Sequence, residues 1–395
     1  MRGIVKSLVV LVVLCVGASG AWAQGWSLIW SDEFEGKAGA APDGKSWTYD
    51  IGGNGWGNQE LETYCSPGKS EPAPCSADKP NVFLDGRGHL VIRAQRVSAE
   101  PAPAGSWTSG RMKSEGLRDF TFGRMEACIA MPSGAGIWPA FWMLGSVGKW
   151  PAGGEIDIME NIPSTVPHGP GMGPGAVQAT IHGTTKEAGK AAYDVGKRFT
   201  FPAGQGVNDA ACHIYGVVRS KYMMQFYVDD WRKPFFITTA SDLKEGDAWP
   251  FEAPFFFLLN VAVGGSWPGP PDASTQSPSD MSVDYVRVYE AQKQDTFVMV
   301  AEPIAMQADQ TGSTTLQVKG TAGMGFVYVT CSSAVPGTKC AMESGNPLNE
   351  SVLDLRERAE TTAKVKVTGA AALIVVKAYT VGGVEATLRI EVGRR

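Results

Sequence analysis

Hydrophobic and polar positions alternate in short runs along residues 26–290, and Gly, Pro, Asn and Asp separate the runs. Alternation with a period of two over five to seven residues is typical of strands. No long amphipathic helical pattern interrupts these runs. The pattern therefore predicts an all-β sandwich or barrel, whose clearest strands are residues 90–94, 123–129, 214–218, 224–229, 255–260 and 283–289.

The composition and the hydrophobic pattern of the chain change after residue 289. A polar stretch leads to a region in which aromatic residues are rare and short strands alternate cleanly, as at 316–319, 365–367 and 388–392. We expect a linker at residues 291–296 and a small, immunoglobulin-like β-sandwich at residues 297–395. This region has no Trp with which to stack on a sugar ring. A spacer or stabilising domain is therefore favoured over a carbohydrate-binding module.

Three carboxylates lie within six residues of a β-prone run: Glu155, Asp157 and Glu160, separated by Ile, Ile and Met. Apolar spacers favour burial against a sheet, unlike those of a solvated acidic loop. In a regular strand Glu155 and Asp157 share one face, and Glu160 points to the other. A β-bulge near Met159 would return Glu160 to the first face, and bulges are frequent beside active sites. The sequence therefore predicts such a bulge.

Two glutamates on one face with an aspartate between them suit retaining glycoside hydrolysis. We expect Glu155 to be the nucleophile and Glu160 the general acid/base. Asp157 would orient the nucleophile, and its charge would raise the pKa of Glu160. The alternatives are a calcium loop or a salt-bridged strand. A calcium loop would have Asp, Asn and Gly as spacers in place of Ile and Met.

Aromatic and polar side chains suited to a sugar cleft occur in residues 55–60, 109–111, 136–144, 180–182 and 260–269. Trp56 and Trp267 are in Gly-rich segments and are assigned to the cleft. Core packing and substrate contact are equally good interpretations of Trp138 and Trp142. On its own, His182 fits a structural histidine better than a site residue.

The first residues have the form of a secretory signal peptide, residues 1–23, with a basic start, an apolar core and a small-x-small cleavage site. The apolar core is too short to span a membrane, and no later stretch is long enough. The mature chain, residues 24–395, is therefore expected to be secreted, without membrane attachment and as a monomer. The net charge of −5 and the absence of basic clusters argue against a nucleic-acid partner.

Six cysteines follow the predicted signal, which favours disulfides in an exported protein. The simplest pairs are Cys65 with Cys75 and Cys331 with Cys340, because each closes a short loop. Cys128 with Cys212 then remains, although six cysteines allow fifteen connectivities. The chain has no Cys-x-x-Cys and only four scattered histidines, so a zinc cluster is not expected.

Several motifs together resemble glycoside hydrolase family 16, in particular its laminarinase-type endo-β-1,3-glucanases. In chain order between residues 26 and 290 they are Gly-Trp-Gly-Asn, Trp-Pro-Ala-Phe-Trp, Glu-x-Asp-x-x-Glu, Thr-x-His, Leu-Asn-x-Ala-Val-Gly-Gly and the closing Val-Asp-Tyr-Val-Arg-Val-Tyr. The resemblance implies a concanavalin A-like β-jelly-roll catalytic domain over residues 24–290. It further implies β-1,3-glucan or mixed β-1,3/1,4-glucan bound across a concave sheet and cleaved with retention.

The resemblance also implies roles for individual residues. Glu155, Asp157 and Glu160 match the nucleophile, the assisting acid and the acid/base. The remaining matches are residues that hold the sugar beside the scissile bond (Asn58, Arg111 and Asn260), a histidine near the acid/base (His182) and the walls of subsites (Trp138, Trp142, Trp150 and Trp267). The Gly- and Pro-rich residues 163–175 depart from the family pattern, so the resemblance does not predict the cleft rim beside Glu160.

No cofactor is expected for catalysis. Relatives often bind one structural calcium, and the matching ligands are the backbone carbonyls of Glu33 and Gly88 with the side chain of Asp284. Folding without a metal is the alternative. Other functions stay open: hydrolysis of another polysaccharide, such as agar or a galactan, transglycosylation through the same covalent intermediate, or non-catalytic glucan binding on the same fold. A binding-only relative need not keep both Glu155 and Glu160.

Overall fold

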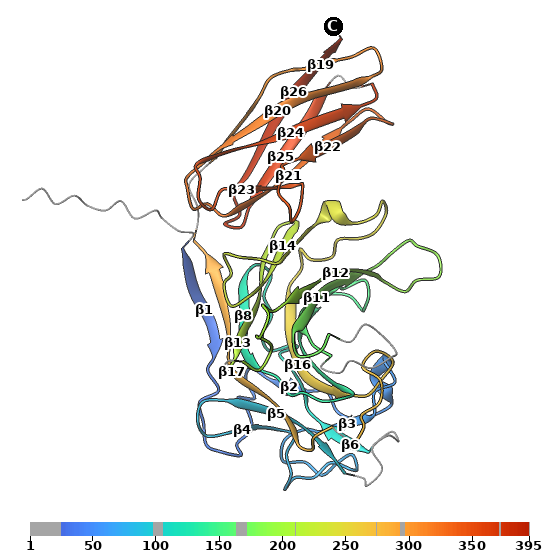
Figure 1. The fold of residues 1–395 in the computed structure, drawn as a ribbon, viewed down its shortest axis with the longest axis vertical. Coiled ribbons are helices and arrows are strands. Elements are labelled where there is room, and N and C mark those ends of the chain that lie inside the picture. Colours follow the sequence, from blue (N-terminus) through green and yellow to red (C-terminus); the bar gives the residue numbers. More distant parts are fainter. Residues whose placement is uncertain are drawn as a thin grey trace, which may run out of the picture.

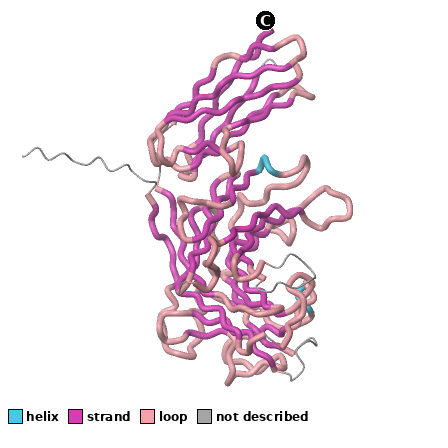
Figure 2. The backbone as a smooth tube through the Cα atoms, viewed as in Figure 1, coloured by secondary structure: helices cyan, strands magenta, loops and turns pink. Residues whose placement is uncertain are grey.

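The computed structural model describes residues 25–97, 106–162, 172–209, 211–273, 275–292, 297–370 and 373–394. The predicted signal peptide, most of the predicted linker and residues 163–171 lie outside these ranges. Within them the chain is all-β, as predicted, and its only helical turns are η1 (Gly55–Gly57) and η2 (Ala240–Asp242) (Figure 2). Among the same residues, no helix is long and apolar enough to cross a membrane.

Two largely antiparallel sheets form the first domain (Figure 1), and each predicted strand lies within an observed one, except that the strand predicted at residues 224–229 ends one residue earlier, at Val228. The ten-stranded sheet has the order β15 (Phe236–Thr239), β14 (Met223–Val228), β13 (His213–Ser220), β8 (Gly123–Ala130), β17 (Ser279–Ala291), β5 (Leu90–Arg96), β6 (Trp107–Ser109) and β3 (Glu62–Tyr64), with β1 (Trp26–Asp32) beside β17 and β4 (Val82–Leu84) beside β5. The seven-stranded sheet has the order β12 (Tyr193–Thr200), β11 (Ala176–Gly183), β10 (Glu155–Glu160), β9 (Ile137–Gly145), β16 (Phe255–Val263), β7 (Arg111–Lys113) and β2 (Thr48–Tyr49).

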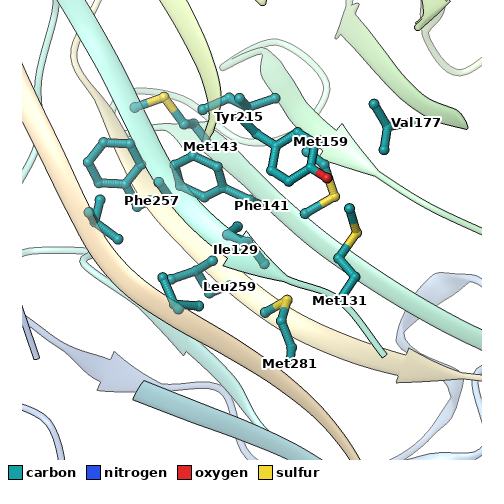
Figure 3. Packing of buried hydrophobic residues seen from close by; sticks show 14 of the residues in the cluster. Ile129, Met131, Phe141, Met143, Met159, Val177, Tyr215, Phe257, Leu259 and Met281 are labelled. Atoms are coloured by element: carbon teal, nitrogen blue, oxygen red, sulfur yellow. The ribbon is translucent and has the colours of Figure 1, made fainter. Parts of the chain in front are cut away.

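The core lies between these two sheets (Figure 3). Phe141 of β9 and Phe257 of β16 point inward from the seven-stranded sheet and stack with ring centroids 5.6 Å apart. Ile129 and Met281 point inward from the ten-stranded sheet, and all four side chains are inaccessible to solvent. Each buried side chain of this size stabilises the fold by about 1.5–3 kcal/mol. Because side chains alternate along a strand, the residues between these core positions point to the outer face of the seven-stranded sheet.

The C-terminal region is a smaller two-sheet sandwich, as predicted, and its immunoglobulin-like character stays a prediction. One sheet has the order β18 (Val298–Ala301), β20 (Thr311–Lys319), β24 (Glu360–Thr368) and β22 (Lys339–Glu343). The other has the order β19 (Ile304–Met306), β26 (Glu385–Arg394), β25 (Leu373–Thr380), β21 (Phe326–Ser333) and β23 (Val352–Asp354).

The two sandwiches are docked through an apolar interface at the end of the first domain where β13 and β14 meet (Figure 1). Met223 and Tyr227 of β14 belong to one buried cluster with Tyr328 and Tyr379 of the second domain. A hydrogen bond joins the Tyr328 and Ser241 hydroxyls at 2.7 Å. These contacts favour a stabilising domain over a free spacer.

The three disulfides have the predicted pairing. Cys65 is bonded to Cys75, Cys128 to Cys212 and Cys331 to Cys340. The long-range bond joins β8 to the residue before β13, within the ten-stranded sheet.

Candidate active site

A cleft of about 1140 Å³ lies on the outer face of the seven-stranded sheet. Side chains alternate between the two faces of a strand, so the residues next to each core position point away from the core and line the cleft. On β9, for example, Phe141 enters the core while Trp138 and Trp142 face the cleft. All twelve predicted catalytic and substrate-binding residues line it: Trp56, Asn58, Arg111, Trp138, Trp142, Trp150, Glu155, Asp157, Glu160, His182, Asn260 and Trp267.

The predicted β-bulge is present in β10. Asp157 pairs with Trp142 of β9, and Met159 pairs with Phe141, so one extra residue lies between them. Pairing with β11 shifts by the same single residue. Ile158 and Met159 consequently both enter the core. Glu160 is thereby turned back to the cleft beside Asp157.

The two glutamates bind their protons more tightly than exposed glutamates do. Burial and the charge of Asp157 raise the pKa of Glu155. Burial and the charges of Asp157 and Glu155 raise the pKa of Glu160 well above the ordinary range. Trp138 Nε1 donates to Glu160 Oε1 at 3.1 Å, and Trp150 donates a hydrogen bond to Glu155. Each acid therefore has one indole that fixes its orientation.

Asp157 and His182 form an ion pair beside the glutamates. His182 Nε2 lies 2.9 Å from Asp157 Oδ2, and His182 Nδ1 lies 2.6 Å from Asp194 Oδ1. Burial alone would lower the pKa of His182, but the hydrogen bond and charge of Asp157 and the charges of Glu155 and Asp194 raise it to about 10. With a carboxylate at each nitrogen, the ring is held as imidazolium. Its charge lowers the pKa values of Glu155 and Glu160 and so partly offsets the effect of burial.

The other end of the cleft is a network around Arg111. Its guanidinium lies 5.0 Å from the ring centroid of Trp56 and 4.7 Å from that of Trp142. It also forms an ion pair with Asp50 at 2.9 Å. Trp142 Nε1 donates to Asn260 Oδ1 at 2.8 Å. Desolvated cation–π contacts of this kind are worth up to about 2 kcal/mol and hold the aromatic walls in place.

Asp194 and Glu60 are residues of the site that could not be singled out from the sequence. Asp194 lies on β12 directly opposite His182, and only the strand register reveals this. Glu60 also lines the cleft. Its place follows from η1, where Trp56 adopts a left-handed backbone with φ of 46°. The predicted rim at residues 163–175 is described only from residue 172 onward.

The predicted calcium ligands converge on one place in the ten-stranded sheet, away from the cleft. β1 ends at Asp32, opposite Val286 of β17, and β5 begins at Leu90, opposite Val283. Glu33 and Gly88, just outside these two strands, therefore flank Asp284. Asp284 is itself the extra residue of a bulge against β8. The Glu33 carboxylate is bonded to Arg287 at 2.7 Å, so its backbone carbonyl is the donor left for a metal. Oxygen donors alone fit a hard cation.

Comparison with known proteins agrees with this geometry. The model of the family "Glycosyl hydrolases family 16" matches residues 71–287. The "Beta-glucanase" of Rhodothermus marinus is 35% identical, over 68% of this chain and 86% of that protein. The "Keratan-sulfate endo-1,4-beta-galactosidase" of Sphingobacterium multivorum is 28% identical, over 92% of this chain and 77% of that protein.

Solved structures lead to the same family. The laminarinase catalytic domain from Thermotoga maritima is 36% identical and superimposes with a TM-score of 0.55, covering 68% of this chain and 99% of that one. The match leaves about a third of the present chain uncovered, in keeping with a catalytic domain followed by a second domain. A glycoside hydrolase on an all-β jelly-roll thus accounts for the bulge, the acids and the aromatic cleft, and this chain belongs to glycosyl hydrolase family 16.

Proposed function

We propose that this protein is a secreted, retaining endo-hydrolase of β-1,3-glucan or mixed β-1,3/1,4-glucan. The observation that carries the proposal is the bulge in β10, which gathers Glu155, Asp157 and Glu160 in one aromatic-lined cleft. The laminarinase and β-glucanase activities of the relatives supply the substrate class. The cleft crosses the sheet, which suits attack within a chain.

In the first step the Glu155 carboxylate attacks the anomeric carbon, while Glu160 donates its proton to the departing glycosidic oxygen. The C–O bond to the leaving sugar breaks, and an ester to Glu155 forms. In the second step Glu160 takes a proton from water, the water oxygen attacks the anomeric carbon, and the ester breaks. Two inversions give net retention.

Charge decides which glutamate holds the proton. Glu160 is 8% exposed, and the charges of both Asp157 and Glu155 oppose its ionisation. Both glutamates receive an indole hydrogen bond and the attraction of the His182 imidazolium, but Glu155 is opposed by one carboxylate charge, that of Asp157, where Glu160 is opposed by two. The proton of the pair therefore resides on Glu160, as an acid at this position requires.

A galactan or keratan-type polysaccharide is the second candidate substrate. The observation in its favour is the match to the keratan-sulfate endo-1,4-β-galactosidase, which spans 92% of this chain and so extends into the C-terminal domain. Non-catalytic glucan binding has less support, because binding alone does not require two buried glutamates with raised pKa values.

A product profile tests the proposal. The protein is incubated in parallel with laminarin, mixed-linkage β-glucan, agar and keratan sulfate, and the oligosaccharides are separated by length and linkage. We expect a ladder of β-1,3-linked oligosaccharides from laminarin at early times. Release of single glucose units alone would contradict endo cleavage. Cleavage of agar or keratan sulfate alone would overturn the substrate assignment.

Three further features belong to the proposal. Secretion is supported by the signal-like residues 1–23 and by the three disulfides, which persist in oxidising compartments. A structural calcium would be held by the carbonyls of Glu33 and Gly88 and by Asp284. Chelation should then lower the melting temperature and leave the chemical step unchanged. The protein acts as a monomer, without membrane or nucleic acid.

A further inference from the structure

Two acids that the mechanism does not use are buried beside the cleft. Glu60 is 6% exposed, and Glu62, on β3, is 1% exposed. Burial of a carboxylate is costly unless it is paired and hydrogen-bonded. Their partners therefore indicate what this pair does.

Glu60 accepts hydrogen bonds at both of its oxygens. Asn58 Nδ2 donates to Oε1 at 2.9 Å, and the Tyr64 hydroxyl donates to Oε2 at 3.0 Å. An ionised carboxylate accepts at both oxygens, whereas a protonated one has to donate from one of them. With a donor at each oxygen, Glu60 has the hydrogen-bonding pattern of the charged member of the pair.

Glu62 is the protonated member. Its Oε2 accepts from the backbone amide of Val263 at 2.8 Å, and no donor among the described residues reaches its buried Oε1, which leaves that oxygen to carry a proton toward Glu60. Burial, together with the hydrogen bond and charge of Glu60, raises its pKa well above the ordinary range. Besides Glu60, the charged or titratable neighbours of this cluster are Tyr64, which burial keeps protonated, and Arg111. Two carboxyls this close cannot both ionise, so the pair holds one proton.

A continuous chain of hydrogen bonds joins the pair to the cleft. The Tyr64 hydroxyl, which donates to Glu60, accepts from Asn260 Nδ2 at 3.2 Å. Asn260 in turn accepts from Trp142 at its Oδ1. Asn58, Asn260 and Trp142 all line the cleft. The Asn58 bond to Glu60 uses its amide nitrogen and leaves its Oδ1 to accept from a sugar hydroxyl.

We propose that Glu60 and Glu62 form a proton-sharing acid pair that positions Asn58 and Asn260 for the sugar at this end of the cleft. This proposal rests on the proposed function. Neither acid touches the reacting atoms, so both are positioning residues. The negative charge of Glu60 strengthens the bonds from Asn58 and Tyr64, since hydrogen bonds to ionised groups are roughly twice as strong as neutral ones.

The first test compares Glu60→Gln with Glu62→Gln. In Glu60→Gln the amide NH₂ has to face one of two donors, so an Asn58 or Tyr64 contact is lost. We expect kcat/KM on laminarin to fall about 10- to 100-fold, the loss of a hydrogen bond to a charged group, mainly through KM. Glu62→Gln replaces one neutral donor by another and should stay within about threefold, whereas Glu62→Ala should resemble Glu60→Gln.

Glu126→Gln is the matched control. Glu126 is also 6% exposed, and its Oε2 accepts from the Tyr227 hydroxyl at 2.5 Å, but it lies on β8 and does not line the cleft. The Glu126→Gln substitution should lower the melting temperature and leave kcat/KM unchanged. If Glu60→Gln lowers kcat/KM no more than Glu126→Gln does, the positioning role is wrong. If Glu62→Gln is as damaging as Glu60→Gln, Glu62 does not carry the proton.

A second readout does not depend on activity. Because the pKa of Glu62 is higher in the folded than in the unfolded chain, its contribution to stability is present below the unfolded value and lost as pH rises through the folded value. The glutamine side chain of Glu62→Gln cannot ionise. The melting temperature of this variant should therefore rise relative to that of the wild type as pH increases. If the difference in melting temperature between Glu62→Gln and the wild type does not change with pH, the two acids do not share a proton. If the wild type cleaves no glucan, the proposed function fails, and this comparison still tests the pair.

Discussion

The two sandwiches of this molecule use the same strand alternation for different ends. In the second, β24 buries Val365 and Val367 and exposes Lys364 and Lys366, the residue before each. In the first, β10 likewise buries Ile156 in the core, yet Asp157 on the outward side is only 3% exposed. An outward polar position that is nevertheless buried needs a compensating partner. The site is therefore recognised by polar side chains that are buried on the outer face of a sheet, and an acidic residue in the sequence is not sufficient by itself.

The largest effect should come from removing the general acid. Glu160→Gln eliminates proton donation to the leaving oxygen, and kcat on laminarin should fall about 10²–10⁴-fold. The measurement is reducing-end release at the pH optimum. Glu343→Gln, an exposed acid of β22 that pairs with Lys366, is the matched control and should change nothing. If Glu160→Gln and Glu343→Gln are equally active, the buried acid of the first sandwich contributes no more to catalysis than an exposed acid of the second.

Deleting residues 297–395 should destabilise the first domain. The deletion uncovers Val218, Met223, Tyr227 and Ile237, which are buried against the second domain. Each newly exposed apolar side chain costs up to about 1.5–3 kcal/mol, so the melting temperature should fall by many degrees. Thermal unfolding of the two chains measures this. An unchanged melting temperature would mean that the second domain is a spacer.

The charge of Asp157 should control the pH profile. Its charge raises the pKa of Glu160, so in Asp157→Asn that pKa falls. Glu160 then loses its proton at lower pH, and the alkaline limb of kcat/KM moves to lower pH. Initial rates on laminarin across the pH range measure the shift. A limb that stays in place or moves upward would show that Asp157 does not act through charge.

The smallest effect is expected at the rim of the domain interface. Asn349 Nδ2 donates to Asp242 Oδ2 at 2.7 Å. Asn349→Ala should cost about 0.5–1.5 kcal/mol, lower the melting temperature by a few degrees and leave kcat/KM unchanged. A change in kcat/KM as large as that of Asp157→Asn would instead connect the second domain to the chemistry.

Much of the site could be predicted because strand parity is a local property. The bulge followed from three acids and their apolar spacers alone. For Trp138 and Trp142, sequence left core and cleft equally open, and the observed alternation places both in the cleft. Asp194 and Glu60 could not be predicted, because their roles depend on strand register and on the turn at η1.

The docking of the second domain was also beyond the sequence. Met223 and Tyr227 alternate in β14 like any strand residues, and nothing local separates an apolar side chain that meets its own core from one that meets a neighbouring domain. The proposed calcium site is an intermediate case. Register brings its three predicted ligands to one place, while occupancy depends on conditions outside the chain.

Azide rescue of Glu155→Ala tests the central claim most directly. Removing the nucleophile should abolish turnover of laminarin. Azide then enters from the vacated side, and a single displacement should give a glycosyl azide of inverted anomeric configuration, which NMR identifies. Glu160→Ala with azide should give the retained product. An inverted product from Glu160→Ala, or a retained one from Glu155→Ala, would contradict the roles assigned to the two acids.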